Sequence, residues 1–149
     1  MTHIRPVGNG VYSAGQPNEA ELAALARNGM RTIINLRHPS EASEFDEADA
    51  VAAAGMRYVS IPVSGAQELT PETVTRFSEE MEDARSRGPV LIHCGSANRV
   101  GALIALEQAW VQGQSPDVAL AAGRAAGLAG LEPVVIEHLG SAGHVNDIP

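Results

Sequence analysis

Three segments of this chain repeat one pattern, in which apolar residues at helical spacing lead to a glycine and then to a short apolar run. Glycine tolerates the left-handed conformation that ends a helix, so each of these glycines is expected to follow a helix directly. They are Gly29, Gly55 and Gly88. Strands that alternate with helices of crossover length predict parallel β-α-β units. The repeat therefore predicts an α/β fold around a mostly parallel sheet.

The expected elements fill the chain without a linker or a low-complexity tract. Strands are expected over residues 10–13, 31–36, 57–61 and 90–93, and helices over residues 18–28, 41–54, 71–87, 100–111, 117–126 and 131–139. The stretch 100–111 is apolar on nearly every side, which predicts a helix at the centre of the fold. The tail, residues 140–149, is expected to be irregular. The predicted organisation is one α/β domain over residues 1–149, with a central sheet of four or five strands flanked by helices.

The length and the cysteine content of the chain narrow the kinds of protein that it can be. A chain of 149 residues can bury roughly 68–70% of its unfolded surface, so it needs no disulfide or structural metal. Cys94 is the single cysteine, which excludes an internal disulfide and a zinc site built from several cysteines. No apolar run approaches the ~20 residues of a bilayer span, and the start has no signal-like apolar core. A cytoplasmic protein is expected.

The charge of the chain limits its partners. The formal net charge is −8, and all ten basic residues are arginines. A strongly acidic chain without a basic run is a poor ligand for nucleic acids and anionic membranes, so neither is expected as a partner. Its long-range field also opposes anionic substrates. Any anion site must therefore be a local arrangement of donors.

Such an arrangement is predicted where the strand 90–93 ends and the central helix begins. The loop opens with Cys94 and closes with Arg99. The first N–H groups of a helix carry partial positive charge, and a thiol there is expected to ionise more readily than a free cysteine. The amides of a loop of small residues can surround an anion, and an arginine fork suits a tetrahedral oxyanion. The loop therefore predicts a nucleophile beneath a bound oxyanion, with no metal or organic cofactor.

The loop sequence HCGSANR, followed by VGALIAL, resembles the signature loop of cysteine-dependent protein phosphatases of the dual-specificity type. The wider chain resembles the bacterial phosphatase-like domain that is fused to β-lactamase-hydrolase-like proteins. The motifs YSAGQP, TIINLR, YVSIPV and HCGSANR occur in the expected order. The resemblance implies hydrolysis of phosphomonoesters, either small molecules or phosphoproteins, through a phosphocysteine.

The resemblance also implies roles for the loop residues. Cys94 would attack phosphorus, and the Arg99 side chain would bind the phosphoryl oxygens together with loop amides. The amides are those of Gly95, Ser96, Ala97, Asn98 and Arg99. His93 would orient the cysteine backbone, or it is a core histidine bonded to a nearby carbonyl.

Three features depart from the most common pattern of this class. Four residues separate Cys94 from Arg99, whereas most members of this class have five. The resemblance to the fused-domain relatives implies four, as found here. Ala97 stands where a glycine is expected, and a positive φ there would strain it. Val100 replaces a hydroxyl residue that helps the second step, so breakdown of the phosphocysteine is expected to be slow.

The general acid is less clearly marked. In the family an aspartate follows the third strand, whereas residues 63–69 of this chain hold only one carboxylate, Glu68. Glu68 is therefore the candidate acid, or a solvated residue before a helix. Glu41, Glu44 and Asp46 are rivals, for which a solvated helix face is the simpler interpretation.

Residues at the ends of other strands can also border the site, because ligands bind beyond the carboxyl ends of parallel strands. Arg37 and His38 follow the second strand of the repeat, and Gln16 lies in the AGQP turn. Arg37 can support the oxyanion pocket or pair with Glu41 or Glu44. Gln16 is a supporting residue or a turn residue.

Two other functions fit the same loop. A cysteine followed by five residues ending in arginine is also the active-loop length of rhodanese-type sulfurtransferases, in which the thiolate carries a persulfide. A third possibility is an oxyanion-binding module without catalysis, since a fold does not determine its chemistry. The natural substrate and the oligomeric state are left open by the sequence.

Overall fold

The structure, a computed structural model, describes residues 3–146 and the side chains up to residue 140. A five-stranded sheet has the order β1-β2-β5-β3-β4. The strands are β1 (Ile4–Gly8), β2 (Val11–Ala14), β3 (Thr32–Asn35), β4 (Arg57–Ser60) and β5 (Val90–His93). Strands β2, β5, β3 and β4 run parallel, and only the edge strand β1 is antiparallel to its neighbour. The predicted α/β class is confirmed.

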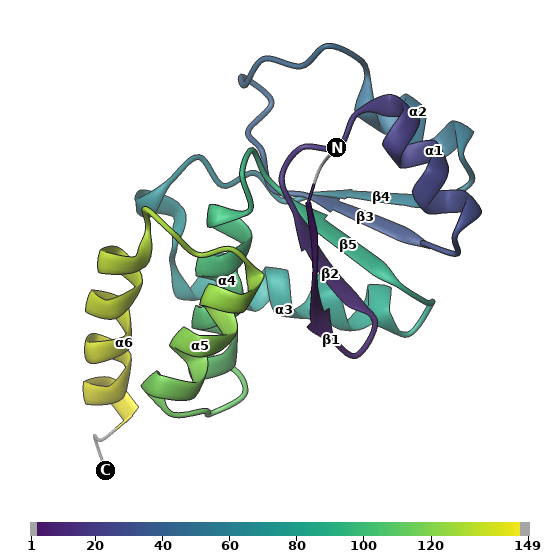
Figure 1. The fold of residues 1–149 in the computed structure, drawn as a ribbon. Coiled ribbons are helices and arrows are strands. Elements are labelled where there is room, and N and C mark those ends of the chain that lie inside the picture. Colours follow the sequence, from purple (N-terminus) through teal and green to yellow (C-terminus); the bar gives the residue numbers. More distant parts are fainter. Residues whose placement is uncertain (1–2, 147–149) are drawn as a thin grey trace.

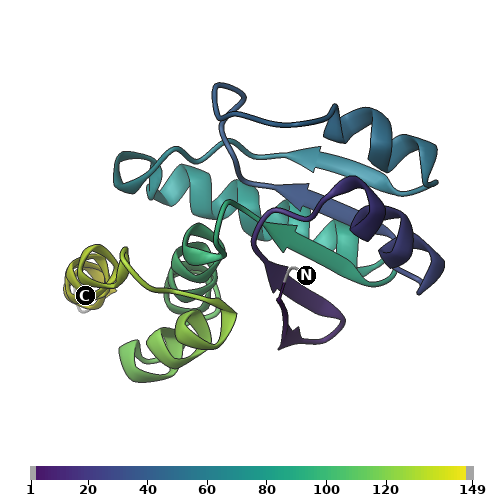
Figure 2. The same cartoon turned by 45° about the horizontal axis from the view of Figure 1, so that its top comes forward.

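Helices cover both faces of this sheet (Figures 1 and 2). Their bounds are α1 (Glu19–Arg27), α2 (Glu47–Ala53), α3 (Pro71–Arg85), α4 (Asn98–Trp110), α5 (Pro116–Ala126) and α6 (Glu132–Asn146), with a short 3-10 turn η1 (Ala66–Glu68). One face packs against α1 and α2, and the other against α3, α4 and α5, with α6 outside α4 and α5. None of the helices within residues 3–146 combines the length and apolarity that a bilayer crossing requires.

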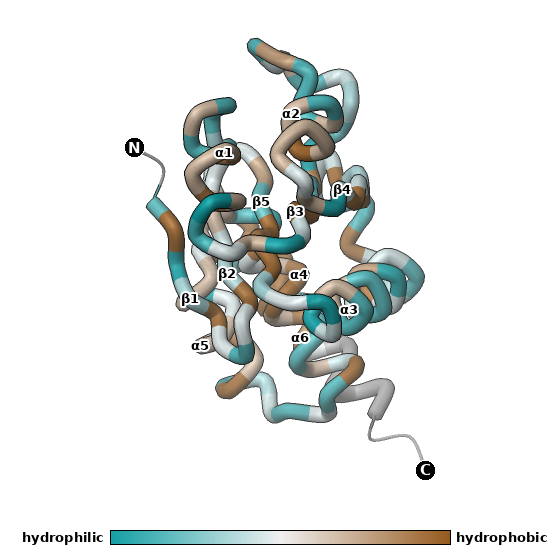
Figure 3. Tube along the Cα trace, turned by 90° about the vertical axis from the view of Figure 1, so that its right-hand side faces the viewer, coloured by the Kyte–Doolittle hydropathy of each residue, from teal (hydrophilic) through white to brown (hydrophobic). Residues whose placement is uncertain are grey.

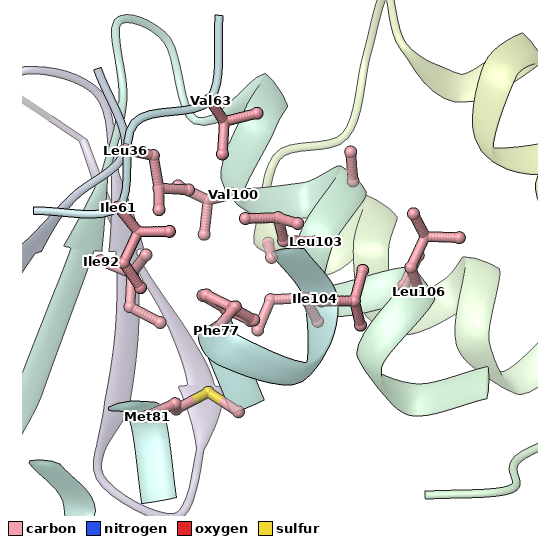
Figure 4. Close-up of a cluster of buried hydrophobic side chains, with 14 of the residues drawn as sticks. Leu36, Ile61, Val63, Phe77, Met81, Ile92, Val100, Leu103, Ile104 and Leu106 are labelled. Carbon is pink, nitrogen blue, oxygen red and sulfur yellow. The ribbon is translucent and has the colours of Figure 1, made fainter. Parts of the chain in front are cut away.

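The central strands β3 and β5 are mostly apolar because they are buried on both faces (Figure 3). Neighbouring residues of a strand point to opposite faces. Ile33 and Leu91 accordingly pack toward α1 and α2, whereas Ile34 and Ile92 pack toward α3 and α4. In the larger core, Phe77 of α3 is fully buried between the sheet and α4 (Figure 4).

Helix α4 occupies the centre of the fold, as its apolar sequence predicts. Every residue from Val100 to Glu107 is buried. It contacts the sheet and the helices α3, α5 and α6. Because α4 is packed on several sides, the loop at its N-terminus is attached to a deeply buried helix.

Several predicted boundaries were wrong. The helix expected over residues 41–54 begins only at Glu47, since Asp46 caps it through the Asp49 N–H group and residues 41–46 form a loop. Strand β1 was not predicted, because its sequence IRPVG contains residues that disfavour central strands and are tolerated at an edge. Helix α6 continues to Asn146 through part of the tail expected to be irregular, and residues 147–149 lie outside the described residues.

Two glycines allow α4 and α5 to touch through their backbones. A Cβ atom on Gly101 would lie 2.2 Å from the Leu128 amide nitrogen and 2.7 Å from the Gly123 carbonyl oxygen. A Cβ atom on Gly123 would in turn lie 2.8 Å from the Gly101 carbonyl oxygen. A side chain at either position would therefore push the two helices apart, together with the segment that follows α5.

We expect Gly101→Ala to lower the free energy of unfolding by about 3 kcal/mol, because the added methyl group meets backbone atoms that cannot move independently. Gly140→Ala is the matched control: position 140 is an exposed site on α6 with open space around it. That change should raise the stability by about 0.5–1 kcal/mol, through the lower backbone entropy of alanine. Urea unfolding measures the free energy of unfolding of both variants. An equal change in the two variants would contradict the close contact of α4 and α5.

Candidate active site

Cys94 directly follows β5 and so lies at the carboxyl edge of the parallel strands. Its backbone position is determined by the two strands on either side. The Cys94 N–H group donates to the Ala14 carbonyl oxygen (3.3 Å), and the His93 carbonyl oxygen accepts from the Leu36 N–H group (2.9 Å). Cys94 is fully buried, whereas the next two residues are exposed. The thiol therefore lies at the floor of the loop that leads into α4.

The loop presents a set of backbone donors that the protein does not use. Within the described residues, no acceptor takes the amide N–H groups of residues 95–99. Unpaired N–H groups at a helix N-terminus attract an anion. The amides from Gly95 to Arg99, which the sequence predicts to surround an anion, are thus left without a protein acceptor in the described residues.

Ala97 turns this loop with a left-handed backbone, at φ 76° and ψ −4°. The strain expected at this position is therefore real, and a non-glycine residue in this conformation costs about 1–2 kcal/mol. Its buried methyl group packs on Gly127, where a Cβ atom would come within 2.6 Å of the Ala97 Cβ atom. Alanine in the loop is thus accommodated by glycine in the neighbouring chain segment.

The Asn98 side chain is turned away from the anion cradle. Its Oδ1 atom accepts from the N–H groups of Ala129 (2.8 Å) and Leu131 (3.1 Å), and so ties the loop to the connection between α5 and α6. Asn98 can therefore contribute only its backbone amide to an anion. Ser96 is exposed at the rim of the loop, beside Gly95.

The Arg99 guanidinium is held in one orientation by acceptors outside the loop. Its Nη1 and Nη2 atoms donate to the two Glu41 carboxylate oxygens (2.6 and 2.9 Å), and Nη1 also donates to the Val63 carbonyl oxygen (2.9 Å). A guanidinium has five N–H donors, of which these bonds use three. The two that remain, on Nε and Nη2, form a fork along one edge. A Cβ atom on Gly95 would lie 3.3 Å from Nη2, so this edge faces the loop.

Glu41 is an ionised anchor for this arginine and not a proton donor. Hydrogen bonding to Arg99, opposed by partial burial and aided by the His38 N–H group and Arg37, lowers the pKa of the Glu41 carboxyl to about 2. The same pair, with a smaller contribution from the neighbouring Cys94, raises the pKa of the Arg99 guanidinium. Glu41 therefore does not lie on a solvated helix face. The six-residue loop before α2, residues 41–46, carries it across to Arg99.

A chain of polar contacts continues from Glu41 to the cysteine. Arg37 donates to Glu41 (3.2 Å) and to the Gln16 Oε1 atom (2.7 Å). The Nε2 atom of the Gln16 side chain in turn donates to Glu47 (2.8 Å). Glu47 then lies 2.5 Å from the Nε2 atom of the buried His93. Arg37 thus pairs with Glu41, and Gln16 connects two charged groups beside the loop.

His93 is buried and contacts both the residue that follows it and Glu47. Its Nδ1 atom donates to the Cys94 carbonyl oxygen (3.3 Å), a contact that both predicted interpretations allow, and its orienting role stays a prediction. The Nε2 atom faces Glu47, so the ring is held from both sides. Glu47 was missed from the sequence. Its signal was the helical spacing of Glu47 and Val51 on the buried face of α2.

Glu68 lies in the turn η1 and its carboxylate accepts from both the N–H and the hydroxyl group of Ser64. These bonds lower the pKa of the Glu68 carboxyl, so it is ionised in this conformation. Of the rivals, Asp46 caps α2, and exposed Glu44 lines a hollow that also includes Gly95. The catalytic role of Glu68 stays a prediction.

Taken together, the loop offers a buried sulfur, a set of unpaired amides and one free edge of a guanidinium. Among the side chains described, no group of three or more His, Cys, Asp or Glu residues could hold a metal ion. An arrangement of this kind can bind a tetrahedral oxyanion and attack its central atom.

Comparison with known protein sequences points to one family. A family model described as "DSP-PTPase phosphatase fused to NAD+ Kinase" matches residues 7–131. The beta-lactamase hydrolase-like protein of Agrobacterium fabrum is 37% identical over 100 residues, which are 64% of this chain and 22% of that protein. The dual specificity protein phosphatase TpbA of Pseudomonas aeruginosa is 28% identical over 111 residues, 74% of this chain and 48% of TpbA. This chain therefore spans about a fifth of the Agrobacterium relative and about half of TpbA.

Solved structures share the fold over nearly the whole chain. A DUF442 protein of Shewanella putrefaciens has a TM-score of 0.73 at 28% identity, covering 93% of this chain and 91% of that one. A Neisseria meningitidis protein has a TM-score of 0.77 at 25% identity, covering 93% and 97%. A cysteine-to-serine variant of TpbA, in complex with phosphotyrosine, has a TM-score of 0.70 at 21% identity, covering 93% and 88%, which shows the fold alone.

The Glu41–Arg99 pair predicts a pH-dependent contribution to stability. The Glu41 pKa falls from the ordinary 4.5 to about 2 on folding, so the pair stabilises the fold fully above pH 4.5. This stabilisation is lost as the pH falls toward 2. We therefore expect Glu41→Gln to be less stable than the wild type by a constant amount between about pH 5 and 7, with the difference shrinking below pH 4.5.

Urea unfolding across this pH range measures the difference. Glu44→Gln is the matched control, because Glu44 is exposed three residues further along the same loop. The control should follow the wild type at every pH. A Glu41→Gln deficit that persists undiminished at pH 2 would mean that the carboxylate charge is not what holds Arg99.

Proposed function

The chain belongs to the family described as DSP-PTPase phosphatase fused to NAD+ kinase, and on that premise we propose that it hydrolyses phosphomonoesters through a phosphocysteine at Cys94. The observation that carries the proposal is the free Nε–Nη2 edge of Arg99, which faces unpaired loop amides above the buried sulfur. This geometry supports binding of three phosphoryl oxygens at once. We propose this hydrolysis as the activity of the whole protein.

In the first step the Cys94 thiolate attacks phosphorus in line with the leaving oxygen. The new S–P bond forms as the P–O bond to the leaving group breaks, and the leaving oxygen takes a proton from a general acid. The amides of residues 95–99 and Arg99 hold the equatorial oxygens where negative charge is borne. Since these donors are oriented before the substrate arrives, they need little reorganisation during the reaction.

In the second step a water molecule attacks phosphorus, the S–P bond breaks, and phosphate leaves as the thiolate is restored. The water gives up one proton to a general base, which balances the proton donated in the first step. The residue after Arg99 is the buried Val100, which offers no hydroxyl group to this step. We therefore expect breakdown of the phosphocysteine to be the slower step.

The substrate class follows from the same donors. The complex of TpbA with phosphotyrosine supports a phosphate-containing substrate, whether a small molecule or a phosphoprotein. The net charge of −8 without a basic run supports a partner other than nucleic acid or an anionic membrane. The lone cysteine supports a cytoplasmic setting, where thiols stay reduced.

Turnover of p-nitrophenyl phosphate tests Cys94 as the nucleophile and the Arg99 side chain as the donor to the phosphoryl oxygens. We expect Cys94→Ser to remove at least about 10³-fold of kcat/KM, because a hydroxyl at this position lacks an activating base. Arg99→Ala should cost about 10²–10³-fold through the loss of charge stabilisation at the transition state. Arg27→Ala, an exposed arginine at the end of α1, is the control and should keep the wild-type rate.

Sulfur transfer from thiosulfate to cyanide is measured beside phosphate release. Phosphate release that survives Cys94→Ser would refute the nucleophile. Sulfur transfer without phosphate release would make the protein a sulfurtransferase. Vanadate binding with no turnover of any phosphoester would make it an oxyanion-binding module.

Leaving-group dependence tests Glu68 as the general acid. We expect Glu68→Gln to slow hydrolysis of phenyl phosphate by about 10²-fold and that of p-nitrophenyl phosphate much less, because a good leaving group needs no proton. Glu72→Gln, an exposed residue in the first turn of α3, is the control. Full activity of Glu68→Gln on phenyl phosphate would remove Glu68 from the mechanism.

The Ser64 contact gives this test a pH dependence. The two Ser64 bonds lower the Glu68 pKa, so Ser64→Ala, which loses the hydroxyl bond, should raise it. An acid must be protonated to act, and the rate therefore falls as the pH rises through its pKa. In Ser64→Ala, the alkaline limb of the pH–rate profile for phenyl phosphate should accordingly move to higher pH.

A further inference from the structure

Arg5 is an arginine whose side chain has no acceptor within the described residues. Seven of the ten arginines donate to a carboxylate or a backbone carbonyl; they are Arg37, Arg57, Arg76, Arg85, Arg87, Arg99 and Arg124. Arg27 and Arg31 share the unpaired state of Arg5, but they precede β3 and so lie at the opposite edge of the sheet from the loop. In a chain of net charge −8, an unpaired arginine close to the catalytic loop has a specific consequence.

The direction of β1 places Arg5 beside that loop. Strand β1 is antiparallel to β2, so its first residues lie where the parallel strands end. Ile4 is opposite Ala14, whose carbonyl oxygen accepts from the Cys94 N–H group, and Arg5 is opposite Ser13. His3 is two residues from Arg5 along the extended chain, so both side chains lie on the same side of β1. The edge strand thus adds two basic side chains to the carboxyl edge of the sheet.

A hollow of about 290 Å³ joins these side chains to the loop. It is lined by His3, Arg5, Gly15, Gln16, Gly95 and Ser96. Gly95 and Ser96 belong to the amide cradle, so the hollow begins where a bound phosphoryl group would end. No carboxylate of the described residues lines it.

The hollow on the other side of Gln16 is lined by groups of both signs. Its volume is about 410 Å³, and its lining includes the carboxylates of Glu41, Asp46 and Glu47 beside Arg37 and His38, with Arg37 already paired with Glu41. Its three carboxylates make it less favourable for a second anionic group than the hollow at Arg5, which no carboxylate of the described residues lines. The two hollows therefore give a bound phosphomonoester a preferred direction.

We propose that the hollow lined by His3 and Arg5 is a second anion subsite. Its ligand is the carboxylate or phosphate of a small phosphomonoester that carries a second anionic group close to the reacting phosphate. The inference rests on the proposed function, since it takes the loop as the place where the reacting phosphate binds. Arg5 supplies a two-pronged donor for this group, and His3 adds a further donor when protonated.

A matched pair of substrates tests the subsite. 3-Carboxyphenyl phosphate and 3-carbamoylphenyl phosphate have the same ring and nearly the same size, and only the first carries the second charge. We expect the wild type to prefer the carboxylate by about tenfold in kcat/KM, which is the effect of one hydrogen bond to a charged group. The net charge of the protein favours the opposite order, so this preference requires a local cation. It should shrink as the salt concentration rises.

Arg5→Gln should abolish the preference and leave turnover of the carbamoyl substrate within about twofold. That unchanged turnover also shows that the variant is folded. Arg27→Gln, which removes the same charge at the far edge of the sheet, should keep the full preference. Equal rates on both substrates in the wild type, or a preference that survives Arg5→Gln, would overturn the subsite and leave the proposed phosphatase function intact.

Binding separates the subsite from the chemistry. In a Cys94→Ser background, calorimetry should show tighter binding of the carboxylate than of the carbamoyl analogue, and adding Arg5→Gln should remove the difference. This result would support the subsite even if the protein turned over neither compound, an outcome that would refute the phosphatase function. Equal binding of the two analogues in the Cys94→Ser protein would refute the subsite alone.

Discussion

The two hydrogen bonds between Arg99 and Glu41 are the contact on which the arrangement of the site depends. They use one edge of the guanidinium and leave the other facing the loop. Because Arg99 is on α4 and Glu41 is on the loop before α2, this pair also joins the two faces of the sheet. A partly buried pair contributes little net stability when both partners are exchanged, but the loss of one partner leaves the other charge without compensation. Its main effect is therefore orientation.

The same contact is one end of a longer polar network that runs beneath the loop. From Glu41 it passes through Arg37, Gln16 and Glu47 to His93, which bonds the carbonyl oxygen of the nucleophile residue. A network of this kind is worth more than isolated pairs only when its members are satisfied, as they are here. The backbone of Cys94 is consequently held by the Ala14 carbonyl oxygen and by a histidine that Glu47 keeps in place. The strands and α4 supply the rigid frame, and the network sets the polar groups within it.

The electrostatics of the molecule act at two ranges. The net charge of −8 repels anions at a distance, whereas the loop amides, the free edge of Arg99 and the unpaired Arg5 attract them at close quarters. Salt screens the long-range term most strongly and the partly buried groups least. The hollow at Arg5 is lined by no carboxylate of the described residues, whereas the hollow at Glu47 contains three carboxylates beside Arg37 and His38.

The sequence alone determined the fold class, the central position of α4 and the loop from Cys94 to Arg99. Each of these depends on local order along the chain: apolar periodicity, the glycine that ends a helix, and a strand followed by a buried helix. The family resemblance marked position 97 as one where a positive φ would strain alanine, and the backbone does adopt a positive φ there. Only the tertiary structure decided which carboxylate meets Arg99, that Glu47 lies against His93, that the Asn98 side chain is turned away, and that β1 brings Arg5 to the loop. These contacts join residues far apart in the chain. The packing of loops and edge strands selects which residues meet, and the periodicity of the sequence does not predict that packing.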